Sequence, residues 1–156
     1  MLYMRWGNGF TLLEVLLVIV IAMILLAVSI FTFYEYREKT DLDMATERVL
    51  ETLFEARAKT LSSENRSPYS VHFQGDKAII FKGSTFNASD TTNIDYVLPP
   101  RTTIATISLA GGGNDIIFKR LTGETNQSGT VTLQLVNTPS SSTTISIAST
   151  GLAKKE

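Results

Sequence analysis

Hydrophobic and polar positions divide the chain into three zones. From residue 15 to 33 no residue is charged, and only Ser29 and Thr32 are polar. From residue 34 to 61 apolar residues recur every three or four positions between charged ones, which is the spacing of an amphipathic helix. In residues 62–156, short alternating stretches separated by Gly, Pro and Ser clusters are typical of strands and turns. The pattern predicts an apolar helix, an amphipathic helix and a β-rich domain.

The apolar zone is long enough for a membrane-spanning helix. Of the 24 residues from 10 to 33, 20 are apolar. At about 1.5 Å per helical residue, residues 15–33 would extend roughly 28 Å, close to the ~30 Å hydrocarbon core of a bilayer. We therefore predict a transmembrane and assembly segment over 10–33. A buried core helix would show a polar face, which is missing here. A cleaved secretory signal is suggested by Ala27-Val28-Ser29, but the run is long for one and contains Glu14.

The helix is predicted to continue through residues 34–61, which contain no Gly or Pro and many good helix formers. One helix would then cover 10–61. The predicted buried stripe consists of Leu42, Ala45, Val49, Leu50, Leu53, Ala56, Thr60 and Leu61. An acidic row on the opposite face, which would meet solvent or basic groups of another subunit, consists of Asp43, Glu47, Glu51 and Glu55.

Residues 62–156 predict a small antiparallel β-sheet head packed on the amphipathic half of the helix, so the fold class is α+β. The first two strands should form a hairpin around the Gly75-Asp76 turn. In the first of them, alternation places Ser70, His72 and Gln74 on the exposed face. The predicted strands lie near 69–74, 77–81, 94–98, 102–109, 115–120, 129–136 and 143–149.

The amino-acid composition limits the kinds of binding and catalytic site that the chain could form. The chain has 156 residues, 14 Lys+Arg against 15 Asp+Glu, no cysteine and one histidine. These counts exclude disulfides, Cys-ligated metals and thiol catalysis, and they do not favour a nucleic-acid surface. His72 is expected to be a surface or packing residue. Gly111-Gly112-Gly113 lacks the Lys and the following helix of a phosphate loop. We predict a protein that is not an enzyme and uses no cofactor or metal.

The most specific motif is the junction before the apolar zone, Gly9-Phe10-Thr11-Leu12-Leu13-Glu14. It resembles the N-terminal processing motif of type IV pilins and type II secretion pseudopilins. The resemblance implies that a prepilin peptidase/methyltransferase removes residues 1–9 as a leader, cleaves between Gly9 and Phe10, and methylates the new N-terminus at Phe10. Asn8 departs from the family pattern, in which Lys or Arg often precedes the glycine.

Glu14 carries the unusual charge of this zone. A carboxylate in lipid is costly unless it is paired. Glu14 follows Phe10 by four residues, which places both on one face of a helix. After cleavage, the free amine of Phe10 would offer a partner, either in the same chain or in a neighbour. The family resemblance implies the intersubunit pair, so we predict that Glu14 sets the register between packed helices.

Short motifs within the family most resemble the GspH/FimT group of minor pseudopilins and minor pilins. They are Leu53–Ala58, the Val71–Phe73 strand, Ile117-Phe118, and Ile145–Ile147 before Gly151. The resemblance implies a structural, minor subunit of the type II secretion pseudopilus, which supports secretion across the outer membrane. The alternative in the same class is a minor pilin of a type IV pilus, active in adhesion, motility or DNA uptake. The alternative from another class is a membrane-tethered periplasmic binding domain that does not polymerise.

The resemblance also implies a location and partners. The protein would sit in the inner membrane as a single-pass protein with the head, 62–156, in the periplasm, and would then enter a filament. Its partners would be other pilin or pseudopilin subunits, the prepilin peptidase, the inner-membrane assembly platform and the lipid bilayer.

Four cations are candidates for a weak basic patch. Some FimT-like minor pilins bind DNA through basic C-terminal residues. Here the candidates are Lys119, Arg120, Lys154 and Lys155. Because two lysines followed by Glu156 are a faint version of that pattern, DNA is not the favoured partner.

Overall fold

The structure, a computed structural model, describes residues 9–156, and the side chains of 28–35 and of residue 65 lie outside this description. The chain divides into two compact units, Met1–Arg37 and Glu38–Glu156. Each unit is described by itself.

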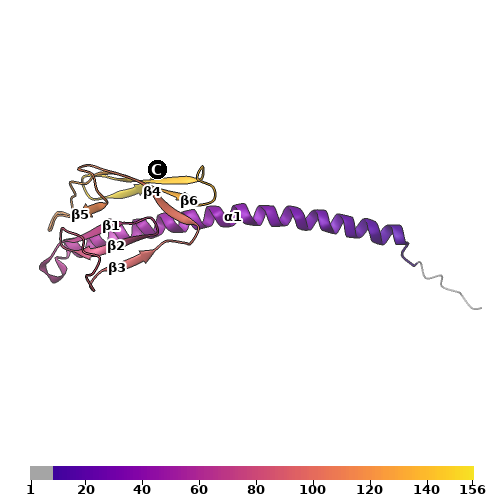
Figure 1. Cartoon of the computed structure of the whole chain (residues 1–156), viewed down its shortest axis with the longest axis horizontal. Helices are drawn as coiled ribbons and strands as arrows, with labels where there is room; N and C mark the ends of the chain where they lie inside the picture. Colours follow the sequence, from indigo (N-terminus) through magenta and orange to yellow (C-terminus); the bar gives the residue numbers. More distant parts are fainter. Residues whose placement is uncertain (1–8) are drawn as a thin grey trace, which may run out of the picture. The chain divides into compact units, whose positions relative to one another are not determined.

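Helix α1 extends from Leu12 to Leu61 (Figure 1). The predicted helix over 10–61 is confirmed except at its first two residues. Thr11 lies just before the helix, and its Oγ1 accepts a hydrogen bond from the Glu14 backbone N at 3.2 Å. The helix ends where Ser63 adopts a left-handed conformation with φ 52°. The absence of Gly and Pro between these points allows α1 to continue without a break.

In the first unit, every described side chain from residue 10 to 27 is exposed. Within the part of the chain that the structure describes, no helix has the length and apolar character needed to cross a membrane. The transmembrane segment over 10–33 stays a prediction. Its last six side chains, 28–33, lie outside the described residues.

In the second unit, two four-stranded antiparallel sheets accompany α1 (Figure 1). This confirms the α+β class, although we predicted one sheet. Sheet A has the strand order β3-β2-β1-β5, and sheet B has the order β4-β6-β7-β8. The strands of sheet A are β1 (Tyr69–Phe73), β2 (Lys77–Lys82), β3 (Ile94–Val97) and β5 (Asp115–Ile117). Those of sheet B are β4 (Thr102–Leu109), β6 (Gly129–Leu135), β7 (Ser142–Ile147) and β8 (Ala153–Lys155). A short 3₁₀ helix, η1 (Glu64–Arg66), links α1 to β1.

The predicted β1–β2 hairpin is confirmed, with Tyr69 paired to Lys82 and Phe73 to Ala78. The strand predicted over 115–120 ends earlier, at Ile117, because the chain turns back and Phe118 makes only an isolated bridge with Thr125. β8 was missed, since three residues ending in two lysines carry no alternating signal.

The core lies where one face of α1 packs against both sheets. The predicted stripe is buried from Leu42 to Thr60, but Leu61 is 38% exposed because α1 ends there. Thr60 is fully buried, and its Oγ1 accepts the Tyr69 backbone N–H at 2.8 Å. The apolar side chains that complete the core include Val71, Phe73, Ile80, Ile116 and Phe118 of sheet A and Val131, Leu133 and Ile145 of sheet B.

The expected exposed face of β1 is covered, which corrects the prediction from alternation. Ser70 is fully buried, and its Oγ donates to Gly83 O at 2.6 Å. Phe86, from the loop over 83–93, stacks on the His72 ring at 3.9 Å and meets the edge of Phe81 at 5.4 Å. The loop therefore gives sheet A a second, smaller buried face. A single aromatic in a polar loop was the only sequence signal for this cover.

Candidate functional site

The predicted cleavage junction lies on accessible, non-helical chain. Gly9 and Phe10 precede α1, and Phe10 is 80% exposed. A Cβ placed on Gly9 would meet no atom within 4 Å. Exposed backbone outside regular structure is the kind of chain that proteases cut most readily. The rest of the predicted leader, 1–8, lies outside the described residues.

Thr11 and Glu14 begin the helix together. The hydrogen bond from the Glu14 backbone N to Thr11 Oγ1 satisfies one of the free N–H groups of the first turn. Thr followed three residues later by Glu is the sequence signature of a capping box, which our sequence analysis did not use. The bond uses the backbone N–H of Glu14 and not its carboxylate, whose role in assembly stays a prediction.

The Glu14 side chain shares a shallow hollow with Phe10. The hollow measures about 220 Å³ and is lined by Phe10, Glu14, Val15, Val18 and Ile19. This placement agrees with the prediction that residues 10 and 14 share one face. Among the described residues, the Glu14 carboxylate has no ion pair. Glu14 therefore places an anion on an apolar surface beside Phe10.

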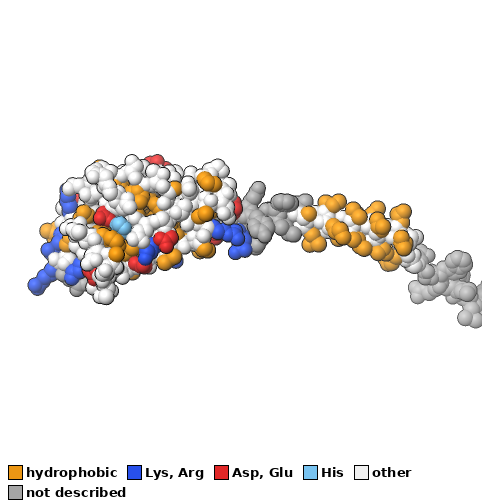
Figure 2. All heavy atoms as spheres, viewed as in Figure 1, with side chains coloured by type: hydrophobic (Ala, Val, Ile, Leu, Met, Phe, Trp, Pro, Cys, Tyr) orange, Lys and Arg blue, Asp and Glu red, His pale blue; other side chains and the backbone are white. Residues whose placement is uncertain are grey.

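An uncovered apolar surface continues from this hollow along α1. The exposed fraction is 58% at Leu16 and 64% at Leu26, and orange side chains appear along this stretch in Figure 2. A second hollow, of about 500 Å³, is lined by Leu12, Val15, Leu16, Ile19, Val20 and Met23. Contiguous apolar surface of this kind marks a protein or membrane contact.

The four predicted basic residues lie on two segments, the turn after β5 and strand β8. Lys155 Nζ is 2.6 Å from Asp43 Oδ1, so its charge is offset within the chain. Lys154 is exposed on β8, and Lys119 and Arg120 are exposed on the turn that follows β5.

Arg57 connects the turn that carries Lys119 and Arg120 to the turn that precedes β8. Its Nε donates to Gly123 O at 3.2 Å, and its Nη2 donates to Thr150 O at 3.4 Å. Gly151 packs so closely that an added Cβ would lie 1.9 Å from Gly123 O. We name Arg57, Gly123 and Gly151 the arginine clamp. It fixes the ends of both sheets to the last turns of α1.

His72 is a packing residue, as predicted. It stacks on Phe86, and its Nδ1 lies 2.5 Å from Asp115 Oδ1. Gly111, Gly112 and Gly113 form the turn between β4 and β5 with positive φ angles, which agrees with the predicted strand connection. In the described part of the chain, no group of three His, Cys, Asp or Glu residues could hold a metal ion.

Of the four residues in the predicted acidic row, Asp43 and Glu55 have partners within the chain. Asp43 pairs with Lys155, and Glu55 pairs with Lys59 at 3.7 Å. Glu55 also accepts a hydrogen bond from the Tyr96 hydroxyl. Burial and then this bond raise the pKa of Tyr96 to about 12. Among the described residues, Glu47 and Glu51 have no ion pair or side-chain hydrogen bond.

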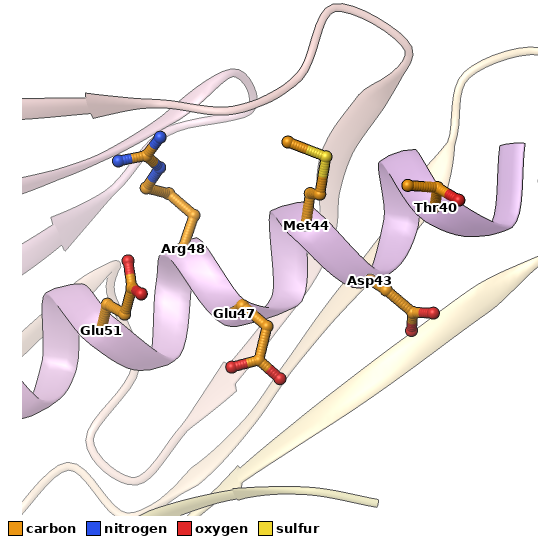
Figure 3. A pocket seen from close by; sticks show the side chains of 6 residues that line it. All are labelled: Thr40, Asp43, Met44, Glu47, Arg48 and Glu51. Carbon is orange, nitrogen blue, oxygen red and sulfur yellow. The ribbon is translucent and has the colours of Figure 1, made fainter. Parts of the chain in front are cut away.

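A groove follows the exposed side of α1 in the second unit and was not predicted. It measures about 380 Å³ and is lined by Thr40, Asp43, Met44, Glu47, Arg48 and Glu51. Asp43 and Glu47 extend to one side of the helix, and Met44 and Arg48 to the other (Figure 3). Met44 is 56% exposed. The groove therefore combines an apolar centre with charges of both signs.

The comparison with known families agrees with the junction. Residues 8–30 match the prokaryotic N-terminal methylation motif. The match includes Gly9, Phe10 and Glu14 and the start of α1. It indicates a prepilin-type, type IV pilin-like protein, and proteins with this motif are typically anchored in a membrane before assembly. No curated protein and no solved structure shows significant similarity to the chain.

Proposed function

We propose that the chain is a structural subunit of a pilin-like filament, assembled through the first half of α1. The observation that carries the proposal is the uncovered apolar surface, which lies within the residues that match the methylation motif and holds one carboxylate, Glu14, without an ion pair among the described residues. Burying apolar area contributes about 25 cal/mol per Å², so neighbouring helices or lipid would stabilise this surface strongly. Within the second unit, the sheets bury the face of α1 from Leu42 to Thr60.

The order of events follows from the junction. The chain enters the inner membrane through 10–33, with 62–156 in the periplasm. The peptidase removes 1–9, and Phe10 gains a cationic, methylated amine. Glu14 of one subunit then accepts the amine of another. Charge pairing away from water is strong only when the geometry is right, so this pair favours a single register among packed helices.

The finer proposal is a minor subunit of the type II secretion pseudopilus. The short motifs that resemble the GspH/FimT group support it. A minor pilin of a type IV pilus is the second candidate, because its subunits carry the same N-terminal motif. A neighbouring secretin, secretion ATPase and several pseudopilin genes would favour secretion, and a retraction ATPase gene would favour a pilus.

Processing tests the first step of the proposal. We expect cells with an active prepilin peptidase to yield a chain that begins at Phe10 and carries one added methyl group in intact-mass measurement. Cells without the peptidase provide the control and should yield the chain with residues 1–9 attached. A chain that keeps its leader beside an active peptidase would contradict the proposal.

Co-purification separates a filament subunit from a tethered binding domain. After chemical crosslinking in membranes, a filament subunit should purify with copies of itself or other pilins. A tethered receptor would purify alone, and that result would refute assembly.

A further inference from the structure

The turn after β5 presents an apolar side chain between charges. Leu121 is 78% exposed and has a left-handed backbone with φ 72°. Bulky residues rarely adopt this conformation. The turn is held by two hydrogen bonds, from Lys119 N to Glu124 O at 2.8 Å and from Gly123 N to Lys119 O at 2.9 Å. We name Lys119, Arg120 and Leu121 the knob.

The knob lies at the end of the second unit where α1 ends. A Cβ added to Gly123, two residues after Leu121, would be 3.2 Å from Leu61 Cδ2. The arginine clamp fixes this turn to the helix. Lys and Arg side chains gather at the same end in Figure 2. The knob is therefore a fixed projection from a basic end.

The groove of Figure 3 has the complementary chemistry. Met44 offers an apolar contact for Leu121, and the unpartnered Glu47 and Glu51 offer anions for Lys119 and Arg120. Arg48 in the groove matches Glu124, the acid beside the knob. Complementary charges around an apolar contact determine specificity and register between partners.

Within one molecule, the knob lies too far from the groove to dock in it. Glu47, in the groove, and Leu61, beside the knob, are 14 residues apart in α1, roughly 21 Å along the helix axis. When two copies are shifted along this axis, the knob of one copy can reach the groove of the other, so the contact joins two different surfaces. A head-to-tail contact whose rotation does not close into a ring repeats and builds a filament.

We propose that the knob of one copy of this chain docks in the groove of a second copy. The inference rests on the proposed filament function and adds a specific contact between the second units to the one made by the apolar helices. Its occupant is a second copy, because both complementary surfaces are present on this chain.

Cysteine crosslinking in the full chain tests the contact, since the chain has no cysteine of its own. In membranes from expressing cells, Met44→Cys combined with Leu121→Cys should give a ladder of disulfide-linked oligomers on oxidation. Met44→Cys with Ala88→Cys is the matched control, because Ala88 is exposed on the loop that covers the outer face of sheet A. A ladder of equal strength from the control pair, or none from the Met44/Leu121 pair, would overturn the proposal.

Charge exchange identifies the occupant. Adding Lys119→Glu and Arg120→Glu to the Met44/Leu121 pair should weaken the ladder by roughly tenfold, and further adding Glu47→Lys and Glu51→Lys should restore it. Loss without restoration would show a different partner and overturn the proposal.

A lysine-reactive crosslinker applied to the unchanged chain distinguishes failure of the proposed filament function from failure of the knob-and-groove contact alone. If it gives no oligomers, the proposed filament function fails together with this inference. If it gives oligomers while the cysteine pair does not link, only the knob-and-groove contact fails.

Discussion

Leucine side chains in the two halves of α1 lie in opposite surroundings. Leu53, in the second unit, is 1% exposed, whereas Leu16, in the first unit, is 58% exposed. The second unit supplies its own sheets to cover the helix. The first unit is an apolar surface that nothing among the described residues covers. The difference teaches that one half of the helix stabilises the fold of the chain and the other half is available to partners.

We expect the largest change in the free energy of unfolding when one leucine in each half of α1 is replaced by alanine. Leu53→Ala should lower the free energy of unfolding by about 4 kcal/mol, because it leaves a cavity in the core. Leu16→Ala, the matched control, should leave that free energy nearly unchanged but reduce oligomers in membranes. Urea titration of the full chain in detergent, together with crosslinking, measures both. Equal losses of stability would contradict the division.

The arginine clamp should give the next largest effect. Gly151 has φ 77°, and an added Cβ would lie 1.9 Å from Gly123 O. Gly151→Ala should therefore lower the unfolding free energy by about 3 kcal/mol, through backbone strain and overpacking together. Gly111→Ala is the control, because φ there is 86° but no atom lies within 4 Å of the added Cβ. It should cost only about 1 kcal/mol of backbone strain. Equal losses in the same urea titration would show that the close packing at the clamp is unimportant.

A smaller effect should appear in alkaline solution. The pKa of Tyr96 is raised to about 12 by burial and by its bond to Glu55, so the folded state holds the phenol proton more tightly than the unfolded chain. The resulting stabilisation is complete below about pH 10, the ordinary tyrosine value, and is lost as the pH rises towards 12. Unfolding free energies measured at pH 9 to 12 should fall less steeply in Tyr96→Phe. Parallel curves for the two proteins would contradict this role.

Much of the fold could be predicted because the helix signals are local. The absence of Gly and Pro, the apolar stripe and the Gly75-Asp76 turn each act over a few residues. The division of the strands into two sheets could not be predicted, since it depends on contacts between distant strands such as β1 and β5. The cover provided by Phe86 was missed for the same reason, and the short β8 was missed because its three residues carry no alternating signal.

The candidate site was predicted in part. Gly9, Phe10 and Glu14 form a contiguous motif, so sequence alone placed them together. The capping by Thr11 was visible in the Thr-x-x-Glu spacing but was not used. The pairing of Lys155 with Asp43 connects residues at opposite ends of the chain, and no local pattern reveals it.

The central claim is that Glu14 joins the apolar half of α1 to other subunits rather than stabilising its own chain. The most direct measurement compares leader removal with incorporation into oligomers in Glu14→Gln and in the unchanged protein. Glu14→Gln keeps the size of the side chain and removes its charge. The account predicts normal cleavage between Gly9 and Phe10 with strongly reduced incorporation. Normal cleavage with normal incorporation would contradict it.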